Sequence, residues 1–226
     1  MGMSWHDLLF AHWPVPARSL RDHIPSALEL DEFDGSAWIA VVPFRMSAVR
    51  PRFVPSLPWI SRFAELNVRT YVRAGGKPGV WFFSLDAANP VAVRAARLSF
   101  ALPYFDAKMS VRLEGDQFDY RSSRTHRGAP PAEFRARYGP TGAAYSSTPG
   151  TLEHFLTERY CLYSIRRDGR ILRGEVDHMP WPLQPARAEI ELNTMIAPIG
   201  VVLPDIPPIL HFANRLDVTA WWPHVI

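Results

Sequence analysis

The sequence predicts a β-dominated α+β fold in which an antiparallel sheet curls into a barrel or half-barrel. About eight to ten short strand patterns follow one another along the chain, and hairpin turn signals join most neighbouring pairs. About three or four short helical patterns interrupt them. The chain has 226 residues, of which 47% are hydrophobic and 21% charged, so it can bury a substantial core. We expect one domain that spans residues 1–226.

Prolines delimit the elements of the first quarter. Residues 16–24 are expected to form a short helix, because a proline fits the first turn and Pro25 stops the helix. The strand patterns at 28–30 and 36–44 flank an Asp-Gly turn and are expected to pair. The segment 51–58 contains three prolines, so we expect a loop there that covers a site.

Residues 65–72 alternate between two chemically different faces. Glu65, Asn67 and Arg69 point to one side of the predicted strand, and an apolar set points to the other. The polar face is either solvent-exposed or the polar lining of a barrel. Periodicity alone favours the exposed face.

The middle of the chain combines a local helix signal with strands. An aromatic strand is expected at 80–87, and Asn89 followed by proline is an N-cap that opens a helix to about Ala101. A strand at 102–113 and its partner at 118–123 form a predicted hairpin.

The second half contains an excursion followed by further strands. Residues 128–149 are rich in Gly, Pro, Ala and Ser and are expected to hold one short helix near 132–138. Thr151 is placed to cap a helix that ends near Glu158. The remaining strand patterns are 161–165, 171–178, 188–192 and 216–222.

Charge and composition exclude several classes of partner. The formal net charge is +3 and the arginines are scattered, so no nucleic-acid partner is expected. No apolar run approaches the ~20 residues of a membrane helix, and the N-terminal segment lacks the features of a signal peptide. Cys161 is the single cysteine, which excludes an internal disulfide. We expect a cytoplasmic protein without a membrane partner.

Motifs for common cofactor and metal chemistry are absent from the sequence. It contains no HExxH, GxSxG, P-loop or GxGxxG pattern, so no metal and no cofactor is expected. Cys161 lies in an apolar strand pattern and is expected to be a core residue rather than a nucleophile.

Several segments together resemble a known group of proteins. These segments are WPVPARSLRDHIPSALELD (13–31), LPYFDAKM (102–109), TLEHFLTERYCLYS (151–164) and QPARAEIEL (184–192), the last followed by MIAPIGV (195–201). In order and spacing they resemble the acetoacetate decarboxylase-like superfamily, and within it the uncharacterised YqjF-like family, a domain of unknown function. The resemblance implies a cone-shaped antiparallel β-barrel with helices packed outside, a small-molecule pocket inside, and a tendency to form homo-oligomers.

The resemblance also bears on the catalytic residues. It implies that Glu65, at the spacing of a pocket glutamate, faces the barrel lumen together with Asn67 and Arg69. The decarboxylases carry a proline followed by two lysines, the first of which forms a Schiff base, whereas here Pro103 is followed by Tyr104 and Phe105. Decarboxylation of acetoacetate by that device is therefore not predicted.

Three residues are candidates for catalysis. Tyr104 stands at the position of the Schiff-base lysine and can donate a hydrogen bond to a carbonyl oxygen, with Glu65 as its partner base. Lys108 is one of only two lysines, and Lys77 lies in a predicted turn, so Lys108 is the candidate for amine chemistry. The alternatives are a core tyrosine and a solvated strand lysine.

Five further residues are candidates for ligand binding, and Asn67 is one of them through its place on the same strand face as Arg69. Arg69, Arg97 and Arg187 suit a carboxylate through paired hydrogen bonds, although helix-surface arginines are commoner than pocket arginines. His178 lies at a strand end and is suited to proton transfer, or else is structural. We therefore expect a small-molecule-binding barrel, a lyase or isomerase on a carboxylated or carbonyl compound. The alternative is a non-catalytic ligand-binding protein on the same barrel.

Overall fold

The computed structural model describes residues 1–50 and 61–226, so the loop predicted at 51–58 lies outside the described residues. The helices are α1 (Arg18–Arg21), α2 (Pro90–Phe100), α3 (Leu152–Thr157) and a 3₁₀ turn, η1 (Ala197–Ile199). The strands are β1 (Gly2–Val15), β2 (Glu29–Leu30), β3 (Ala37–Arg50), β4 (Phe63–Ala74), β5 (Lys77–Ala87), β6 (Tyr104–Glu114), β7 (Gln117–Arg124), β8 (Glu133–Pro140), β9 (Cys161–Ile165), β10 (Ile171–His178), β11 (Gln184–Asn193), β12 (Ile209–Ala220) and β13 (His224–Val225).

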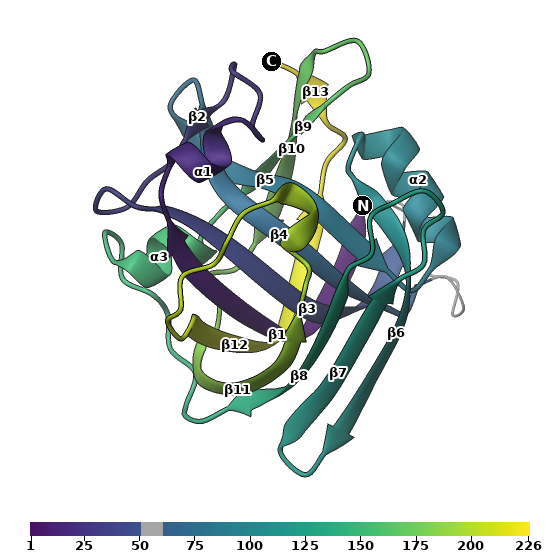
Figure 1. Cartoon of the computed structure of the whole chain (residues 1–226), viewed down its shortest axis with the longest axis vertical. Coiled ribbons are helices and arrows are strands. Elements are labelled where there is room, and N and C mark those ends of the chain that lie inside the picture. The colour runs from purple at the N-terminus through teal and green to yellow at the C-terminus, as the bar shows by residue number, and fades with distance from the viewer. Residues whose placement is uncertain (51–60) are drawn as a thin grey trace.

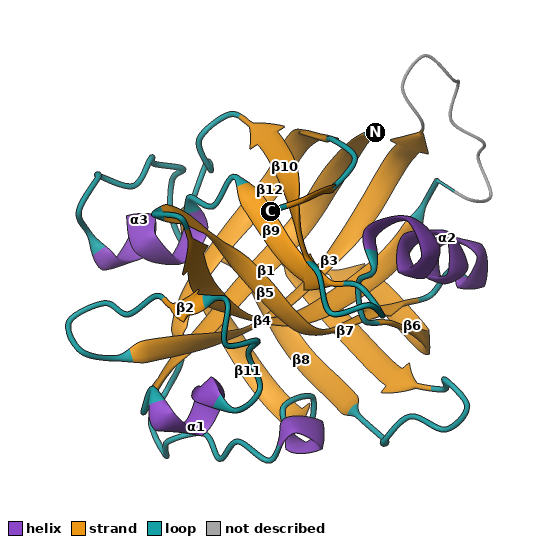
Figure 2. Ribbon diagram, turned by 90° about the horizontal axis from the view of Figure 1, so that it is seen from above, coloured by secondary structure: helices purple, strands orange, loops and turns teal. Residues whose placement is uncertain are grey.

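The described strands form one hydrogen-bonded sheet that closes on itself twice (Figures 1 and 2). Five strands, β5, β4, β3, β1 and β12 in that order, form a wall that both rings share. The larger ring returns from β12 to β5 through β11, β8, β7 and β6, and the smaller ring returns through β10 and β9. The expected β-dominated, barrel-like fold is therefore confirmed. It departs from a purely antiparallel sheet because β6 and β9 both run parallel to β5.

Strand alternation sends the side chains of the shared wall into two different interiors. Leu66, Val68 and Ile39 belong to the large core inside the larger ring. Phe10 and Val42, whose Cβ atoms point the other way, belong to a second cluster on the side of the smaller ring. Glu65, Asn67 and Arg69 of β4 also face this second side, because successive strand residues alternate.

The larger ring has a filled interior. Tyr120, Phe134 and Tyr138 are completely buried there, and Phe212 packs against Tyr138 with 6.4 Å between the ring centres. The tyrosine hydroxyls are satisfied by backbone carbonyls, as in the 2.7 Å bond from Tyr120 to the Glu65 carbonyl oxygen. A packed interior leaves the smaller ring as the side on which a cavity can form.

Helices α2 and α3 begin where the local signals place them, whereas the helix expected over 16–24 is only Arg18–Arg21. The Asn89 side chain accepts hydrogen bonds from the backbone N–H groups of Val91 and Ala92, and Thr151 caps α3 in the same way. Helix α2 lies on the opposite side of the molecule from α1 and α3 (Figures 1 and 2). It connects β5 to the parallel β6, and its Phe100 packs against Leu85 and Leu102.

Three local expectations were wrong. The strand expected at 28–30 pairs with β4 rather than with the strand expected at 36–44, which is part of β3. The helix expected near 132–138 is strand β8, in which Phe134, Ala136 and Tyr138 are buried while the arginines between them are exposed. That period of two is a strand signal. Strand β1 was not expected, because its place in the shared wall buries both faces and removes the alternation that marks an amphipathic strand.

No helix among the described residues is long and apolar enough to cross a membrane.

Candidate functional site

A cavity of about 130 Å³ lies on the side of the shared wall that faces the smaller ring. An engineered apolar cavity of about 150 Å³ holds benzene, so this one suits a ligand of about six non-hydrogen atoms. Its apolar lining includes Leu8, Phe44, Leu85 and Trp181, and its polar lining consists mainly of Glu65, Asn67, Arg69, Tyr104, Arg159 and His178. Among the described residues, no three His, Cys, Asp or Glu side chains lie close enough to hold a metal ion.

Glu65 and Tyr104 form a hydrogen-bonded pair in the cavity wall. The Tyr104 hydroxyl donates to Glu65 Oε2 over 2.9 Å. The two residues meet because β5 pairs with both neighbours, placing its Ala87 opposite Glu65 of β4 and its Leu85 opposite Tyr104 of β6. Glu65 and Tyr104, which are 39 residues apart in the sequence, thereby come within hydrogen-bonding distance.

Burial changes the acidity of this pair. Removal from water raises the pKa of Glu65 to about 8, the hydrogen bond from Tyr104 opposes this rise, and the negative charge of Asp86 adds to it. Burial and the neighbouring Glu65 also raise the pKa of Tyr104 well above its ordinary value. The Glu65 carboxyl group is therefore mostly protonated at neutral pH and is a stronger base than an exposed glutamate when it ionises.

Arg69 brings a positive charge into the same cavity without a carboxylate partner. Its side chain is 9% exposed, and the guanidinium carbon lies 5.3 Å from the centre of the Phe10 ring. Its Nη2 reaches the Leu156 carbonyl oxygen at 3.5 Å, and its Nε has no hydrogen-bond partner. No described acidic side chain forms an ion pair with it, whereas the neighbouring Arg159 is paired with Asp31 at 2.6 Å.

Two other cavity residues carry unsatisfied buried atoms. Asn67 Oδ1 and Trp5 Nε1 have no hydrogen-bond partner among the described atoms. A buried polar group without a partner costs about 1–3 kcal/mol, and a buried unpaired charge costs more. Two of the three atoms around this cavity, Arg69 Nε and Trp5 Nε1, are donors and favour a negatively charged ligand as their partner. The third, Asn67 Oδ1, is an acceptor and favours a ligand that also carries a donor.

His178 lies between the cavity and the surface. Its Nδ1 is 2.7 Å from the Met179 carbonyl oxygen, so the neutral ring carries its proton on Nδ1 and leaves the Nε2 lone pair available. Its ring stacks on Tyr160 with 4.6 Å between the centres. The same residue also lines an outer pocket of about 480 Å³ that contains Asp177 and Asp217. His178 therefore lines both the cavity and this outer pocket.

A different pocket, also of about 480 Å³, adjoins the cavity beside α2 and is called the α2 pocket below. The two spaces share Met46, Phe100 and Tyr104 in their walls. Trp222 lines only the α2 pocket, where it stacks on Phe100 with 5.7 Å between the ring centres. A ligand that enters through the α2 pocket must pass these side chains to reach Glu65.

The structure corrects the expectation for Lys108. Its side chain is exposed and does not line the cavity, although it has the same facing as Tyr104. The offset of four residues carries the chain about 13 Å along β6. β6 pairs with β5 only as far as Asp106, so the face that lines the cavity at Tyr104 meets solvent at Lys108. Lys77 is also elsewhere, in a 2.6 Å ion pair with Glu175.

Two of the expected ligand arginines also lie outside the cavity. Arg97 is exposed on α2, and its Nη1 donates to the Tyr104 carbonyl oxygen over 2.5 Å. Arg187 is exposed and forms an ion pair with Asp116. Both side chains stay at the surface because nothing packs over their elements at these points.

The sequence reasoning missed the contribution of β1 and of the segment after α3. Trp5 lies on β1, and Trp181 stacks against it with 5.8 Å between the ring centres. Arg159 enters the cavity wall from the residues between α3 and β9. The TERYC sequence around Arg159 was the available signal, because a charged residue next to an apolar strand pattern is rarely buried without a role.

Comparison with known proteins places the chain beside relatives of similar length. The model of the family DUF2071, described as an uncharacterized conserved protein, matches residues 2–217. The chain is 45% identical over 221 residues to the uncharacterized protein YqjF of Bacillus subtilis (strain 168), an alignment that covers 98% of this chain and 90% of YqjF. The family resemblance inferred from the sequence segments is confirmed.

Solved structures share the fold at low sequence identity. A structure of acetoacetate decarboxylase has a TM-score of 0.68 at 15% identity, over 100% of this chain and 89% of that one. The enduracididine biosynthesis enzyme MppR complexed with pyruvate has a TM-score of 0.67 at 12% identity, over 99% and 89%. Acetoacetate decarboxylase from Legionella pneumophila has a TM-score of 0.63 at 15% identity, over 100% and 87%. The acetoacetate decarboxylase-like fold is therefore confirmed.

Proposed function

The chain belongs to the DUF2071 family of uncharacterized conserved proteins, and from its cavity we propose that it binds a small carboxylated carbonyl compound and moves a proton on it. The reaction class is that of a lyase or isomerase that works without a lysine Schiff base. The observation that carries the proposal is the Glu65–Tyr104 pair at 2.9 Å in the same cavity as the unpaired Arg69 guanidinium.

The positions of the polar groups support a division of roles. Arg69 supplies a buried positive charge for a carboxylate, and a guanidinium binds a carboxylate through two parallel hydrogen bonds. Asn67 and the Trp5 N–H supply further hydrogen-bonding atoms. The apolar walls exclude water, which strengthens each of these interactions.

The proposed chemical step is a proton transfer at the carbon next to the carbonyl group. The Glu65 carboxylate takes the proton, the electron pair of the C–H bond forms a carbon–carbon double bond, and the π pair of the carbonyl group moves to its oxygen to give an enolate. The enolate charge is stabilised by the Arg69 guanidinium, and the hydrogen bond from Tyr104 holds the Glu65 carboxyl group in place. Return of the proton to the same or a neighbouring carbon completes an exchange or an isomerisation.

The raised pKa of Glu65 suits this role. With a pKa of about 8, roughly one molecule in ten carries an ionised Glu65 at pH 7. A general base works best when its pKa lies near the working pH. We expect the rate to rise with pH up to about 8 and then to level, because the ionised form is the active one.

Non-catalytic binding is the second candidate function, and the distribution of lysines favours it. The chain has two lysines, Lys77 and Lys108, and neither lines the cavity. A protein that keeps this barrel and the positive charge of its cavity but performs no reaction would act as a ligand-binding protein. Acetoacetate decarboxylase and MppR are named as enzymes, which supports the catalytic proposal for this chain by analogy of fold alone.

Hydrogen exchange on small keto acids distinguishes the two functions. Pyruvate and 2-oxobutanoate are incubated with the protein in D₂O at several pD values, and proton NMR follows the loss of the C3 proton signals. We expect protein-dependent exchange that Glu65→Gln slows by at least about 100-fold, since general bases contribute about that much. Lys108→Ala is the matched control and is expected to retain the full rate.

Three other outcomes would contradict parts of this proposal. Saturable binding of either keto acid without exchange overturns the catalytic proposal and leaves the ligand-binding function. Exchange that depends on Lys108 rather than Glu65 contradicts the assignment of the base. Neither binding nor exchange with any keto acid overturns both functions.

Replacement of Arg69 by methionine tests the charge recognition by itself. We expect Arg69→Met to weaken binding of a carboxylated ligand by about 10- to 100-fold, because a hydrogen bond to a charged group contributes about 1.5–3 kcal/mol. The ligand-free variant is expected to be at least as stable as the parent, because an unpaired buried charge is removed. Isothermal titration and thermal unfolding measure the two effects.

The control for this prediction is Arg121→Met, which removes an exposed arginine on β7 that is paired with Asp119. It is expected to leave ligand binding unchanged. A methyl ester of the ligand, which lacks the negative charge, is expected to bind both Arg69 forms about equally. Equal loss of the acid and the ester in Arg69→Met would contradict a carboxylate partner for Arg69.

A further inference from the structure

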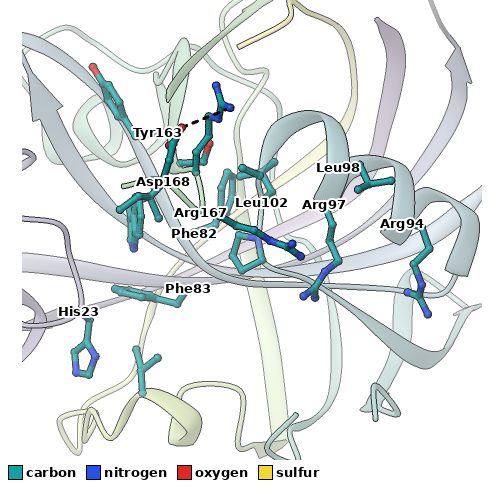
Figure 3. Close-up of a pocket in the computed structure, with 17 residues that line it drawn as sticks. His23, Phe82, Phe83, Arg94, Arg97, Leu98, Leu102, Tyr163, Arg167 and Asp168 are labelled. Atoms are coloured by element: carbon teal, nitrogen blue, oxygen red, sulfur yellow. Dashed lines mark ion pairs between the residues drawn. The ribbon is translucent and has the colours of Figure 1, made fainter. Parts of the chain in front are cut away.

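A separate groove of about 900 Å³ lies on the outer surface, where β9 and β6 pair one after the other with β5 (Figure 3). Strand β9 pairs with Val80 and Trp81 of β5, and β6 pairs with residues 85–87. Because β4 occupies the other edge of β5, both strands follow the same edge, one after the other. Phe82 and Phe83 lie in the gap between them. Crevices where neighbouring strands part are common ligand sites in sheets with parallel strands.

Arginines line one part of the groove, and two of them have no carboxylate partner. Arg94 forms an ion pair with Asp106 at 2.8 Å. Arg97, on α2, donates only to a backbone carbonyl oxygen, and Arg167, in the turn between β9 and β10, has no hydrogen bond or ion pair among the described residues. In Figure 3 the side chains of Arg97 and Arg167 converge from these two elements over the groove.

Aromatic side chains line the other part of the groove. His23 meets Phe83 edge to face with 6.3 Å between the ring centres, and His23 is exposed. Figure 3 places both residues away from Arg94 and Arg97. Trp81 and Phe82 also belong to the lining. The groove therefore offers planar apolar surfaces at one end and two guanidinium groups without a carboxylate partner at the other.

We propose that this groove binds a nucleotide, with the phosphates on Arg97 and Arg167 and the base against His23 and Phe83. Guanidinium groups bind phosphate oxygens through paired charge-assisted hydrogen bonds, and aromatic rings stack on heteroaromatic bases. The volume of about 900 Å³ lies within the range of small-molecule sites. This site is distinct from the Glu65 cavity, although Phe82 and Leu102 line both spaces and so form the wall between them.

Calorimetric titration of the full chain with ADP, inorganic pyrophosphate and adenosine at 0.15 M salt tests the proposal. We expect saturable binding of ADP and of pyrophosphate, with ADP the tighter ligand. Arg167→Gln is expected to weaken both by at least about tenfold, because it removes a guanidinium that has no structural partner. His23→Ala is expected to weaken ADP while leaving pyrophosphate unchanged, since only the base contacts His23.

The matched control is Arg112→Gln, which removes an exposed arginine of β6 that does not line the groove. It changes the net charge by the same amount and is expected to leave binding unchanged. Absence of saturable binding by ADP and pyrophosphate would overturn the proposal, and so would equal weakening by Arg112→Gln. ADP that binds no tighter than pyrophosphate would overturn the placement of the base on His23 and Phe83.

Discussion

At pH 8 the Glu65→Gln variant is expected to be more stable than the parent chain by up to about 5 kcal/mol, with almost no difference at pH 4. Burial raises the pKa of Glu65 from its ordinary value of 4.5 to about 8. Below pH 4.5 the carboxyl group is protonated in both the folded and the unfolded chain, so it has no effect on the pH dependence. Between pH 4.5 and 8 only the unfolded chain ionises, which lowers the free energy of unfolding.

The slope of this loss is about 1.4 kcal/mol per pH unit, and it levels off above pH 8 where the folded chain also ionises. Glutamine keeps the size of the side chain and can still accept the hydrogen bond from Tyr104, so the variant isolates the charge. Urea unfolding at several pH values measures the difference. The control is Glu114→Gln, at an exposed position at the end of β6, which is expected to be nearly neutral.

A Glu65→Gln variant whose stability follows the same pH profile as the parent would contradict the raised pKa of Glu65. The expected gain in stability of Glu65→Gln is also the amount by which the buried Glu65 carboxyl group lowers the free energy of unfolding of the parent chain. A carboxyl group that resists ionisation is unfavourable for stability at neutral pH and favourable for proton transfer there. Enzyme sites commonly show this opposition between stability and function.

Arg124→Met is expected to lower the free energy of unfolding by about 3–5 kcal/mol. The Arg124 guanidinium forms two hydrogen bonds with the Asp86 carboxylate, at 2.7 and 2.9 Å, and the two side chains are 2% and 0% exposed. Burial raises the pKa of Asp86, and the hydrogen bond and charge of Arg124 oppose that rise. Removal of the arginine therefore leaves a buried carboxylate without its partner.

Urea unfolding at pH 7 measures this effect, and Arg121→Met provides the comparison. The exposed Arg121–Asp119 pair has a similar geometry but lies in water, so its loss is expected to cost at most about 1 kcal/mol. A double variant in which Asp86→Leu accompanies Arg124→Met is expected to recover most of the stability, because both charges are removed together. Equal costs for Arg124→Met and Arg121→Met would contradict the argument.

The Asp86–Arg124 pair also connects the fold to the cavity. It fixes the end of β5 to β7, one residue before Ala87, which lies opposite Glu65. The negative charge of Asp86 contributes to the raised pKa of Glu65. We therefore expect the pH profile of hydrogen exchange to shift to lower pH in the double variant.

Local signals in the sequence were sufficient where neighbouring residues decide the conformation. The start of α2 at Asn89 and Pro90 and the capping of α3 by Thr151 depend on contacts within three residues. The alternation in 65–72 correctly groups Glu65, Asn67 and Arg69 on one face, because strand geometry sets that period. The segments that resemble acetoacetate decarboxylase-like proteins gave the fold.

Local signals failed where burial depends on distant strands. Residues 132–138 alternate between buried and exposed positions, but the small and polar residues around them led to the prediction of a helix. Pairing with β7 and β11 makes this segment a strand. Tyr104 and Lys108 have the same facing on β6, and only the end of the pairing with β5 at Asp106 gives one a cavity and the other solvent. No periodicity in the sequence encodes where that pairing ends.

The sequence by itself determined helices α2 and α3, most of the strands, the faces of β4 and the family of the fold, because these follow from local sterics and from residue order. It did not determine β1 or β8, which depend on pairing with distant strands. The tertiary structure alone decided that the polar face of β4 lines a cavity rather than meeting solvent. That outcome requires β9 and β10 to return to the wall and enclose the face, which is a long-range pairing. It also decided that Arg69 is buried without a carboxylate, since the identity of a partner depends on which distant side chains come near.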